Sequence, residues 1–281
     1  MAKISVIGIC GNSIFMNVDH FHEKGETLNA NSVYEEIGGK GINQAVACAK
    51  MGAEVSFLGA IGDDADAEKC RQVAREYGIN GFFATKKGMK TTFAVILTDK
   101  NGENQVTGYR SAELSIEDVI SFEEEIKNSD ILLLQQEVPE SVNEVAVELA
   151  NKHNVKIILN PAPIRAIPEK IAESVFAVTP NEQEKKAIDT NRFRNVITTL
   201  GSKGCSINNE KFINAIAVKP VDTTGAGDTF NGTMAVLLAE GKPLETACRY
   251  AVLASGLSVT KKGVLNAIPT TEEIERKMKD E

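Results

Sequence analysis

The segment 222–228, Asp-Thr-Thr-Gly-Ala-Gly-Asp, carries the residue types best suited to catalysis. Its small residues precede an apolar helical pattern over Thr229–Glu240, and small residues at a helix start let backbone N–H groups approach an anion closely. Asp228 is then either a carboxylate that caps this helix or a general base beside an anion hole. Glycines on both sides and a second acid, Asp222, exceed what a cap requires and favour the base. The candidate catalytic residues are Gly225, Ala226, Gly227 and Asp228.

A second glycine turn, Ile37-Gly-Gly-Lys-Gly-Ile-Asn43, also leads into a helical pattern. Its spacing differs from the GxxxxGK[ST] of a phosphate-binding loop. The first predicted strand is followed by Gly8-Ile-Cys-Gly11, which lacks the third glycine of a dinucleotide-binding turn. The glycine pattern therefore argues against a nucleotide-binding oxidoreductase, although strand–helix alternation alone would allow one.

Composition narrows the classes of function. The 281 residues carry a formal net charge of −8, from 39 acidic and 31 basic residues, which argues against nucleic-acid binding because that affinity comes mostly from basic side chains. Five cysteines, no pair of them in CxxC spacing, indicate buried, reduced thiols in a cytoplasmic protein. The N-terminus has the pattern of a strand and not of a signal peptide, and no run of about 18 apolar residues is present, so we expect no membrane partner.

Short apolar runs that alternate with amphipathic patterns predict the scaffold. The predicted buried strands are Ile4–Ile9, Val55–Ala60, Ile131–Gln135, Val155–Asn160, Phe176–Thr179 and Val196–Leu200. The predicted helices include Ile42–Met51, Ala67–Tyr77, Ser141–Lys152, Thr229–Glu240 and a charged C-terminal helix, Glu272–Glu281. This alternation is typical of a parallel sheet with helices on both faces, in which ligands bind beyond the carboxyl ends of the strands.

Two stretches break the alternation and predict a small separate sheet. Phe15–His22 with Ser32–Ile37, and Thr92–Thr98 with Gln105–Arg110, have the pattern of antiparallel pairs, and the second pair encloses a hairpin turn, Asp99-Lys-Asn-Gly102. Such a sheet could cover a site, form a dimer surface or extend the main sheet. No linker or repeat divides the chain, so we expect one domain over 1–281 with lid strands from about 12–37 and 91–110.

The two glycine segments, in this order and at this separation, resemble the two signatures of the phosphofructokinase B family of sugar and nucleoside kinases. Further matches lie along nearly the whole chain and are closest to the ribokinase branch: Gly25-Glu-Thr27, Gly59–Asp64, Asn160-Pro-Ala-Pro163, Thr179–Glu182, Thr199–Gly204 and Val259–Gly263. The resemblance implies an α/β fold, a three-layer α/β/α sandwich with a mostly parallel central sheet and a small antiparallel β lid. It implies an ATP-dependent kinase that transfers the γ-phosphoryl group to a hydroxymethyl group of a small sugar. A nucleoside kinase and a non-catalytic sugar or nucleotide sensor are the alternatives on this fold.

The resemblance also implies roles for individual residues. Asp228 would take the proton of the acceptor hydroxyl, and the backbone N–H groups of Ala226 and Gly227 would hold the γ-phosphoryl oxygens. The implied acceptor-binding residues are Gly11, Asn12, Ser13, Gly39, Lys40, Gly41, Asn43, Glu137 and Asp228. The implied ATP-binding residues are Asn181, Thr199, Leu200, Gly201, Ser202, Lys203, Gly204 and Gly227.

The resemblance extends to two kinds of cation. Asn181 and Glu184 match a pattern that organises Mg²⁺ and its waters around the phosphates, and oxygen ligands suit this hard cation. An activating monovalent cation such as K⁺ would lie at Asp222, Thr224, Ser258, Lys261 and Gly263. Ala267 stands where a serine ligand is expected, so one ligand of this site is missing.

The chain departs from ribokinases in two places. Gly11 and Ser13 stand where ribokinases carry an Asn-x-Asp that grips the sugar hydroxyls, and the loss of such groups changes which acceptor is preferred. Ribose is therefore in doubt, and we expect Asn12, Ser13, Met16 and Val18 to contact a different acceptor. The segment 180–198 is shorter than in ribokinases and leaves the nucleotide side more open. A homodimer formed through the lid is the expected assembly.

Overall fold

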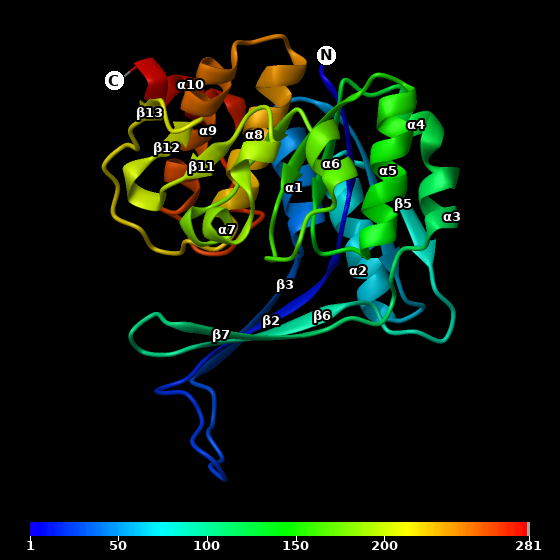
Figure 1. Ribbon diagram of the computed structural model, residues 1–281. Helices are drawn as coiled ribbons and strands as arrows, with labels where there is room; N and C mark the ends of the chain where they lie inside the picture. The colour runs from blue at the N-terminus through cyan, green and yellow to red at the C-terminus, as the bar shows by residue number, and fades with distance from the viewer. Residues whose placement is uncertain (280–281) are drawn as a thin grey trace.

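The computed structural model describes residues 1–279 and contains a central six-stranded sheet with the order β10-β9-β8-β1-β4-β5, parallel throughout. Its strands are β1 (Lys3–Ile7), β4 (Glu54–Ile61), β5 (Asn80–Thr85), β8 (Ile131–Gln135), β9 (Lys156–Asn160) and β10 (Ala177–Val178). Helices lie on both sides of this sheet (Figure 1). The predicted three-layer sandwich is confirmed.

Strand β8 shows why both faces need helices, because all five of its residues are buried. Ile131 and Leu133 pack into one core and Leu132 and Leu134 into the other, as the alternation of a strand requires. The first core is closed by α1 (Lys40–Lys50), α2 (Ala65–Glu76), α8 (Ala226–Ala239), α9 (Leu244–Ser258) and α10 (Thr271–Lys279). The second is closed by α3 (Ile116–Ser121), α4 (Glu123–Lys127), α5 (Glu140–Lys152) and α6 (Glu169–Ser174).

The predicted strands are present, but one joins a different sheet. Strand β11 (Ile197–Thr199) pairs with β12 (Cys205–Ile207) in a three-stranded antiparallel sheet completed by β13 (Lys211–Ile213). Because β10 is only two residues long, its link to this segment is reduced to isolated bridges such as Val178 to Val196. The edge strand β5 is an addition to the sequence prediction.

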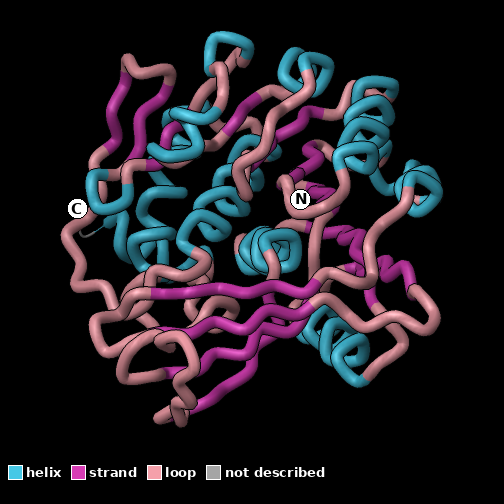
Figure 2. The backbone as a smooth tube through the Cα atoms, turned by 60° about the horizontal axis from the view of Figure 1, so that its bottom comes forward, coloured by secondary structure: helices cyan, strands magenta, loops and turns pink. Residues whose placement is uncertain are grey.

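Four strands form a separate sheet, called the lid here, with the order β3-β2-β6-β7 (Figures 1 and 2). They are β2 (Gly11–Asn17), β3 (Ser32–Gly38), β6 (Phe93–Thr98) and β7 (Asn104–Tyr109). The two predicted hairpins are antiparallel, and β2 joins β6 in a parallel pairing. The first strand of the first hairpin begins and ends earlier than predicted, because β2 runs from Gly11 and residues 18–22 are not strand.

Helix α8 begins at Ala226, three residues before the predicted start, so Asp228 belongs to its first turn. Gly225, directly before it, adopts the left-handed conformation with φ of 75°, which favours glycine. At Gly232 a Cβ atom would lie 2.4 Å from Cβ of Ala47, so only a glycine lets α8 pack this closely on α1. This contact brings the starts of the two glycine-turn helices together.

All five cysteines are free and buried, as predicted. The C-terminal helix α10 confirms the predicted helix up to Lys279, and the last two predicted residues lie outside the described part. Within residues 1–279, none of the helices is long and apolar enough to span a membrane.

Candidate active site

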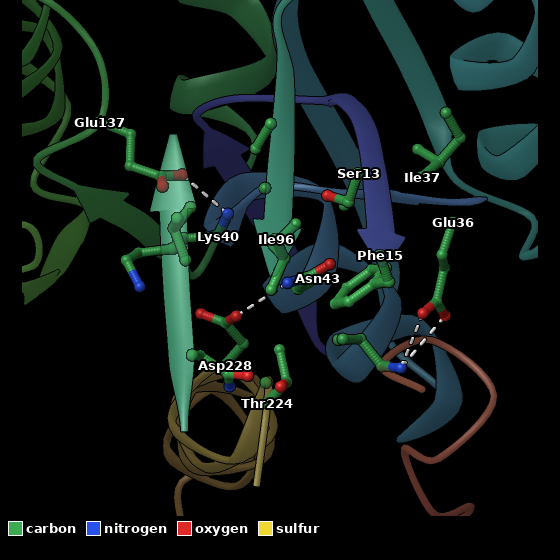
Figure 3. Close-up of a pocket in the computed structure, with 17 residues that line it drawn as sticks. Ser13, Phe15, Glu36, Ile37, Lys40, Asn43, Ile96, Glu137, Thr224 and Asp228 are labelled. Carbon is green, nitrogen blue, oxygen red and sulfur yellow. Dashed lines mark hydrogen bonds between the residues drawn. The ribbon is translucent and has the colours of Figure 1, made fainter. Parts of the chain in front are cut away.

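The carboxylate of Asp228 lies where the N-terminal ends of α1 and α8 meet (Figure 3). Only 6% of this residue is exposed. Its Oδ2 accepts a hydrogen bond from Nδ2 of Asn43 at 2.9 Å, and its Oδ1 accepts one from Nε2 of Gln44, also at 2.9 Å. Both donors are neutral amides, so the carboxylate is oriented without a directly paired cation.

Gln44 is a site residue that the sequence analysis missed. It is fully buried, and its Oε1 accepts a hydrogen bond from Nε2 of Gln135 at 2.8 Å. Its Nε2 also reaches Oδ1 of Asn160 at 3.3 Å. The available signal was its place directly after Asn43 in the glycine turn. Gln44 thus ties the orientation of Asp228 to the carboxyl ends of β8 and β9.

A pocket of about 260 Å³ lies between Asp228 and the lid. Its polar floor comes from the two helix starts and the strand ends, and its apolar ceiling comes from the inner face of the lid and the loop after α9. The floor residues are Gly38, Gly39, Lys40, Asn43, Glu137, Thr224, Gly225 and Asp228. The ceiling includes Phe15, Ala94, Ile96, Val106 and Val264. The lid also contributes the polar side chains of Ser13, Glu36 and Asn104 to this mostly apolar ceiling. Such a pocket suits a small hydroxylated molecule.

Glu137 and Lys40 form the charged wall of this pocket. Oε2 of Glu137 accepts a hydrogen bond from the backbone N–H of Lys40 at 2.7 Å (Figure 3). Burial raises the pKa of Glu137, although the charge of Lys40 acts in the opposite direction. Burial lowers the pKa of Lys40, but the surrounding carboxylates, Asp228 first, outweigh it and the pKa rises overall. Lys40 is therefore held as a cation at the edge of this pocket.

The raised pKa of Glu137 predicts opposite effects of Glu137→Gln on stability and activity. A carboxyl group whose pKa rises on folding stabilises the fold while it is protonated and loses that contribution as pH rises through its folded pKa. At pH 7 we expect the variant to melt at a higher temperature than the wild type, and the gain to vanish in acid below the ordinary carboxyl range. We expect the acceptor KM to rise roughly tenfold, because a charge-assisted hydrogen bond is lost.

Thermal melting from pH 3 to 8 and steady-state kinetics check both parts of this prediction. The control is Glu140→Gln, an exposed acid at the start of α5. Equal melting temperatures of Glu137→Gln and wild type at pH 7 would contradict the assigned burial cost.

The residues after the first strand, Gly11–Ser13, do not all face the pocket beneath the lid. Ser13 lines the pocket, but the side-chain amide of Asn12 points to the other face of the lid, where Nδ2 donates to Glu35 at 3.1 Å and to Asp66 at 3.2 Å. Gly11 borders a smaller adjoining cavity. The alternation of β2 puts Phe15 on the pocket face and Met16 on the outer face, so the expected acceptor contact of Met16 is wrong.

Gly41 serves packing instead of lining the pocket. A Cβ atom on Gly41 would lie 2.7 Å from the Cα of Gly8, so a glycine is needed where α1 meets the end of β1. Val18 directly follows strand β2 and is 4% exposed. It lines neither the pocket beneath the lid nor the adjoining cavity.

A second pocket, of about 320 Å³, lies on the opposite side of the start of α8. It is lined by the predicted nucleotide residues Thr199, Gly201, Ser202, Gly204 and Gly227. The sequence analysis missed its apolar part, which includes Ala215, Val218, Phe230, Val252 and Val259. The predicted residues Asn181, Leu200 and Lys203 do not line it. An apolar slot that ends at a helix N-terminus suits a nucleotide, with its base in the slot and its phosphates at the helix start.

Asn181 and Glu184 form a capping box at the start of α7 (Glu182–Ala187). Oδ1 of Asn181 accepts the backbone N–H of Glu184 at 2.9 Å, and Oε2 of Glu184 accepts that of Asn181 at 2.8 Å. Burial raises the pKa of Glu184. Residues 1–279 contain no cluster of three or more His, Cys, Asp or Glu side chains that would ligate a metal directly. One buried carboxylate beside an amide suits a Mg²⁺ held through water.

The predicted monovalent-cation residues lie on two adjacent loops. Oδ1 of Asp222 accepts the backbone N–H of Thr224 at 3.0 Å, and its Oδ2 accepts that of Gly263 at 3.2 Å. The Val259 carbonyl accepts the N–H of Asp222 at 3.2 Å, so the loop that precedes α8 is fastened to the end of α9. Asp222 thus joins the two segments that hold the predicted ligands.

The fold and the site together define a phosphotransferase with an alcohol group as acceptor: a buried carboxylate at a glycine-rich helix start separates a nucleotide pocket from a small polar pocket beneath a lid. The sequence pattern of the pfkB family of carbohydrate kinases matches residues 1–271, and the chain belongs to this family. Within the family it is an ATP-dependent sugar kinase of the ribokinase type. The predicted resemblance is confirmed.

Relatives support this placement along the whole chain. The ribokinase of Bacillus subtilis is 34% identical over 98% of this chain and 99% of its own. The crystal structure of a ribokinase from Thermotoga maritima has a TM-score of 0.89 at 34% identity and covers 99% of this chain and 100% of its own. An Arabidopsis thaliana ribokinase complexed with ribose and ATP has a TM-score of 0.84 at 28% identity, with 98% of each chain covered.

Proposed function

We propose that this enzyme transfers the γ-phosphoryl group of ATP to a hydroxymethyl group of a small sugar in the pocket beneath the lid. The observation that carries the proposal is the position of Asp228 between two pockets. Asp228 borders the pocket beneath the lid, and the residue directly before it, Gly227, lines the nucleotide pocket. A proton acceptor and a helix start lie between the two pockets, and in-line phosphoryl transfer needs this arrangement.

Each group at the junction has one task in this proposal. The amides of Asn43 and Gln44 orient the carboxylate of Asp228, which accepts the proton of the attacking hydroxyl as its oxygen bonds to phosphorus. Ala226 and Gly227 lie in the first turn of α8, where backbone N–H groups lack intrahelical acceptors. The N–H of Ala226 makes one long bond, of 3.4 Å, to the carbonyl of Thr223, which a phosphoryl oxygen would replace. Lys40 adds positive charge nearby, and Glu137 orients an acceptor hydroxyl. Mg²⁺, bound through water by Asn181 and Glu184, would neutralise phosphate charge.

A coupled ADP-release assay with ATP, Mg²⁺ and K⁺ tests this proposal over pentoses, deoxyribose, hexoses, sugar phosphates and nucleosides. We expect a sugar to be the best acceptor, because relatives at 30% identity or more include ribokinases and deoxyribokinases. Ser13 borders the pocket where ribokinases have an acid, so we expect ribose to be a poorer acceptor than another small sugar. ATP binding without turnover on any acceptor would favour the sensor function instead.

A monovalent cation is the second part of the proposal, at Asp222 and the backbone carbonyls of Thr224, Ser258, Lys261 and Gly263. We expect K⁺ to raise both turnover and the melting temperature relative to equal concentrations of tetramethylammonium, which is too large for a cage of carbonyls. Asp222→Asn should abolish the difference between the two salts in both measurements. Identical melting curves of the wild-type protein in the two salts would rule out the site.

A homodimer through the lid is the third part. The outer face of the lid carries Ile14, Met16, Val33, Val95 and Leu97, and Val33 is 61% exposed. An exposed sheet face with several apolar side chains is typical of a subunit interface. We expect the mass in solution, by light scattering, to be that of a dimer and Val95→Asp to give monomers. A monomeric wild-type protein would contradict the prediction.

The five free thiols fit a reducing, cytoplasmic location.

A further inference from the structure

Glu36 is an acid of the lid that the proposed mechanism does not use. It lies on the inner face of β3, and its carboxylate reaches the loop that follows α9 (Figure 3). Oε1 accepts the backbone N–H groups of Val264 at 3.1 Å and Leu265 at 2.8 Å, and Oε2 accepts that of Val264 at 3.0 Å. Hydrogen bonds to a charged acceptor are roughly twice as strong as neutral ones. Glu36 therefore fastens the lid to the body of the enzyme.

The residue held by Glu36 touches the turn that carries the anion hole. The side chain of Val264 is 5% exposed and packs on Gly225, where a Cβ atom would lie 2.4 Å from Cγ1 of Val264. Val264, Gly225 and Asp228 also border the same acceptor pocket. The position of Val264 therefore depends on the lid on one side and limits the position of the turn on the other.

The loop 263–265 is held from both sides by carboxylates. Gly263 donates its N–H to Asp222, which also accepts the N–H of Thr224, directly before the glycine turn. The next two amides of the loop go to Glu36. A second contact joins the same parts, because Nζ of Lys262 lies 4.6 Å from the ring centroid of Tyr34 on β3. Three successive amides thus connect the lid with the segment that leads into α8.

We propose that Glu36 is a positioning residue that couples closure of the lid to the geometry of the anion hole. With the carboxylate seated on the amides of Val264 and Leu265, the lid is closed over the acceptor and Val264 is held against Gly225. Loss of this contact shifts the lid towards open forms, and the apparent affinity for the acceptor falls with the closed fraction. The inference rests on the kinase function proposed above and deepens it, because it assigns control of that site to a residue remote in sequence.

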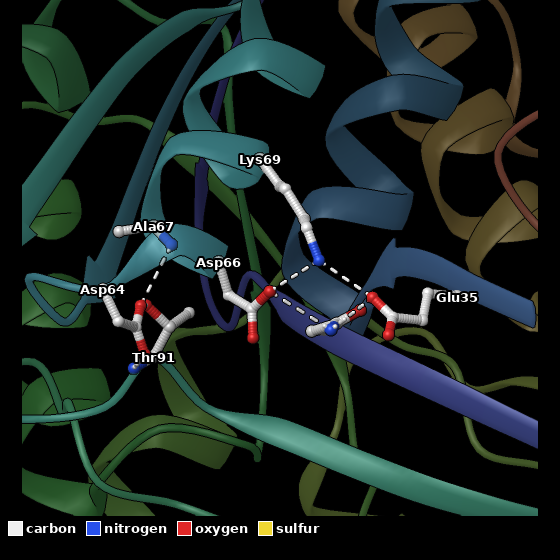
Figure 4. Close-up of polar contacts among 7 residues, drawn as sticks. Glu35, Asp64, Asp66, Ala67, Lys69 and Thr91 are labelled. Atoms are coloured by element: carbon white, nitrogen blue, oxygen red, sulfur yellow. Dashed lines mark hydrogen bonds and ion pairs between the residues drawn. The ribbon is translucent and has the colours of Figure 1, made fainter.

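The test compares wild type with Glu36→Gln and with Glu35→Gln as a matched control. Glu35 is the neighbouring residue of the same strand, but its carboxylate lies on the outer face and pairs with Lys69 at 2.8 Å (Figure 4). Glutamine keeps the size of Glu36 and loses its charge. We expect kcat/KM for the acceptor to fall roughly tenfold in Glu36→Gln, from the loss of charge-assisted bonds, with the KM for ATP unchanged. Glu35→Gln should match the wild type.

Hydrogen exchange on the ligand-free protein gives a second readout that needs no turnover. We expect the amides of Val264 and Leu265 to exchange faster in Glu36→Gln and at the wild-type rate in Glu35→Gln. A lower melting temperature with unchanged acceptor kinetics would reduce Glu36 to a structural residue, and unchanged exchange would overturn the contact itself. If no acceptor supports ADP release by the wild type, the proposed function fails, while the exchange experiment still decides whether Glu36 holds the loop.

Discussion

Asp228→Asn is expected to lower turnover by about 10² to 10⁴, the usual contribution of a general base, while ATP still binds. Asp228 is 6% exposed and its carboxylate is held by two amide donors, so asparagine in its place leaves this position without a group that can accept a proton. The substitution also turns one accepting oxygen into an amide nitrogen that faces Asn43 or Gln44. We therefore expect a moderate loss of stability in addition to the loss of turnover.

The experiment measures ADP release with the best acceptor, and ATP affinity by calorimetry on the same preparations. Glu245→Gln provides the control, because Glu245 is also a first-turn carboxylate but lies half-buried on the neighbouring helix α9, where it pairs with Lys211. We expect this variant to retain full turnover. Turnover of Asp228→Asn within a factor of about ten of wild type, below the range for a general base, would remove the assigned role.

Gly227→Ala is expected to stabilise the protein and inactivate it. Gly227 lies in the first turn of α8, and the space that its Cβ atom would enter is open, because no atom other than those of its chain neighbours and its own helix backbone lies within 4 Å. An alanine in a helix is favoured over glycine by roughly 1 kcal/mol, which corresponds to a melting temperature about 2–4 °C higher in a protein of this size. In the proposed complex the same space holds a phosphoryl oxygen. Obstruction of an anion hole of this kind lowers turnover by about 10² to 10³.

Melting curves and ADP release measured on Gly227→Ala check the expected gain in stability and the expected loss of turnover on the same protein. A stabilised and fully active variant would show that the phosphoryl group does not lie over this residue. A destabilised variant would show that the glycine has a packing role that the geometry does not reveal.

The parts of the fold that follow from local sequence were predicted, and those set by partners distant in sequence were not. The strand Ile131–Gln135 was predicted with its bounds because four consecutive apolar residues followed by a polar one are visible in the sequence itself. Strand β5 was missed because it begins with Asn80-Gly81 and is half-exposed at the sheet edge, which leaves little pattern to detect. Strand β11 was detected, but its antiparallel pairing depends on β12, which has only three residues.

The same distinction holds for the site. Asp228, Asn43 and Gly225 were found because the two glycine turns are visible in the sequence itself, and they line one pocket. Glu36 was missed because its partners, Val264 and Leu265, lie 228 and 229 residues further along the chain. Nothing in the local sequence distinguishes it from Glu35, whose side chain faces the other way.

The insertion of the lid at two loops has a consequence for how such an enzyme could change its substrate. Strands β2 and β3 occupy the connection from β1 to α1, and β6 and β7 the connection from β5 to α3, so the sheet order of the body is independent of both. The lid is therefore a separate structural unit, inserted into the body at two connections. It could be exchanged between relatives to alter acceptor choice while the phosphoryl-transfer machinery stays in place, provided that residue 36 and the segment 263–265 are exchanged together.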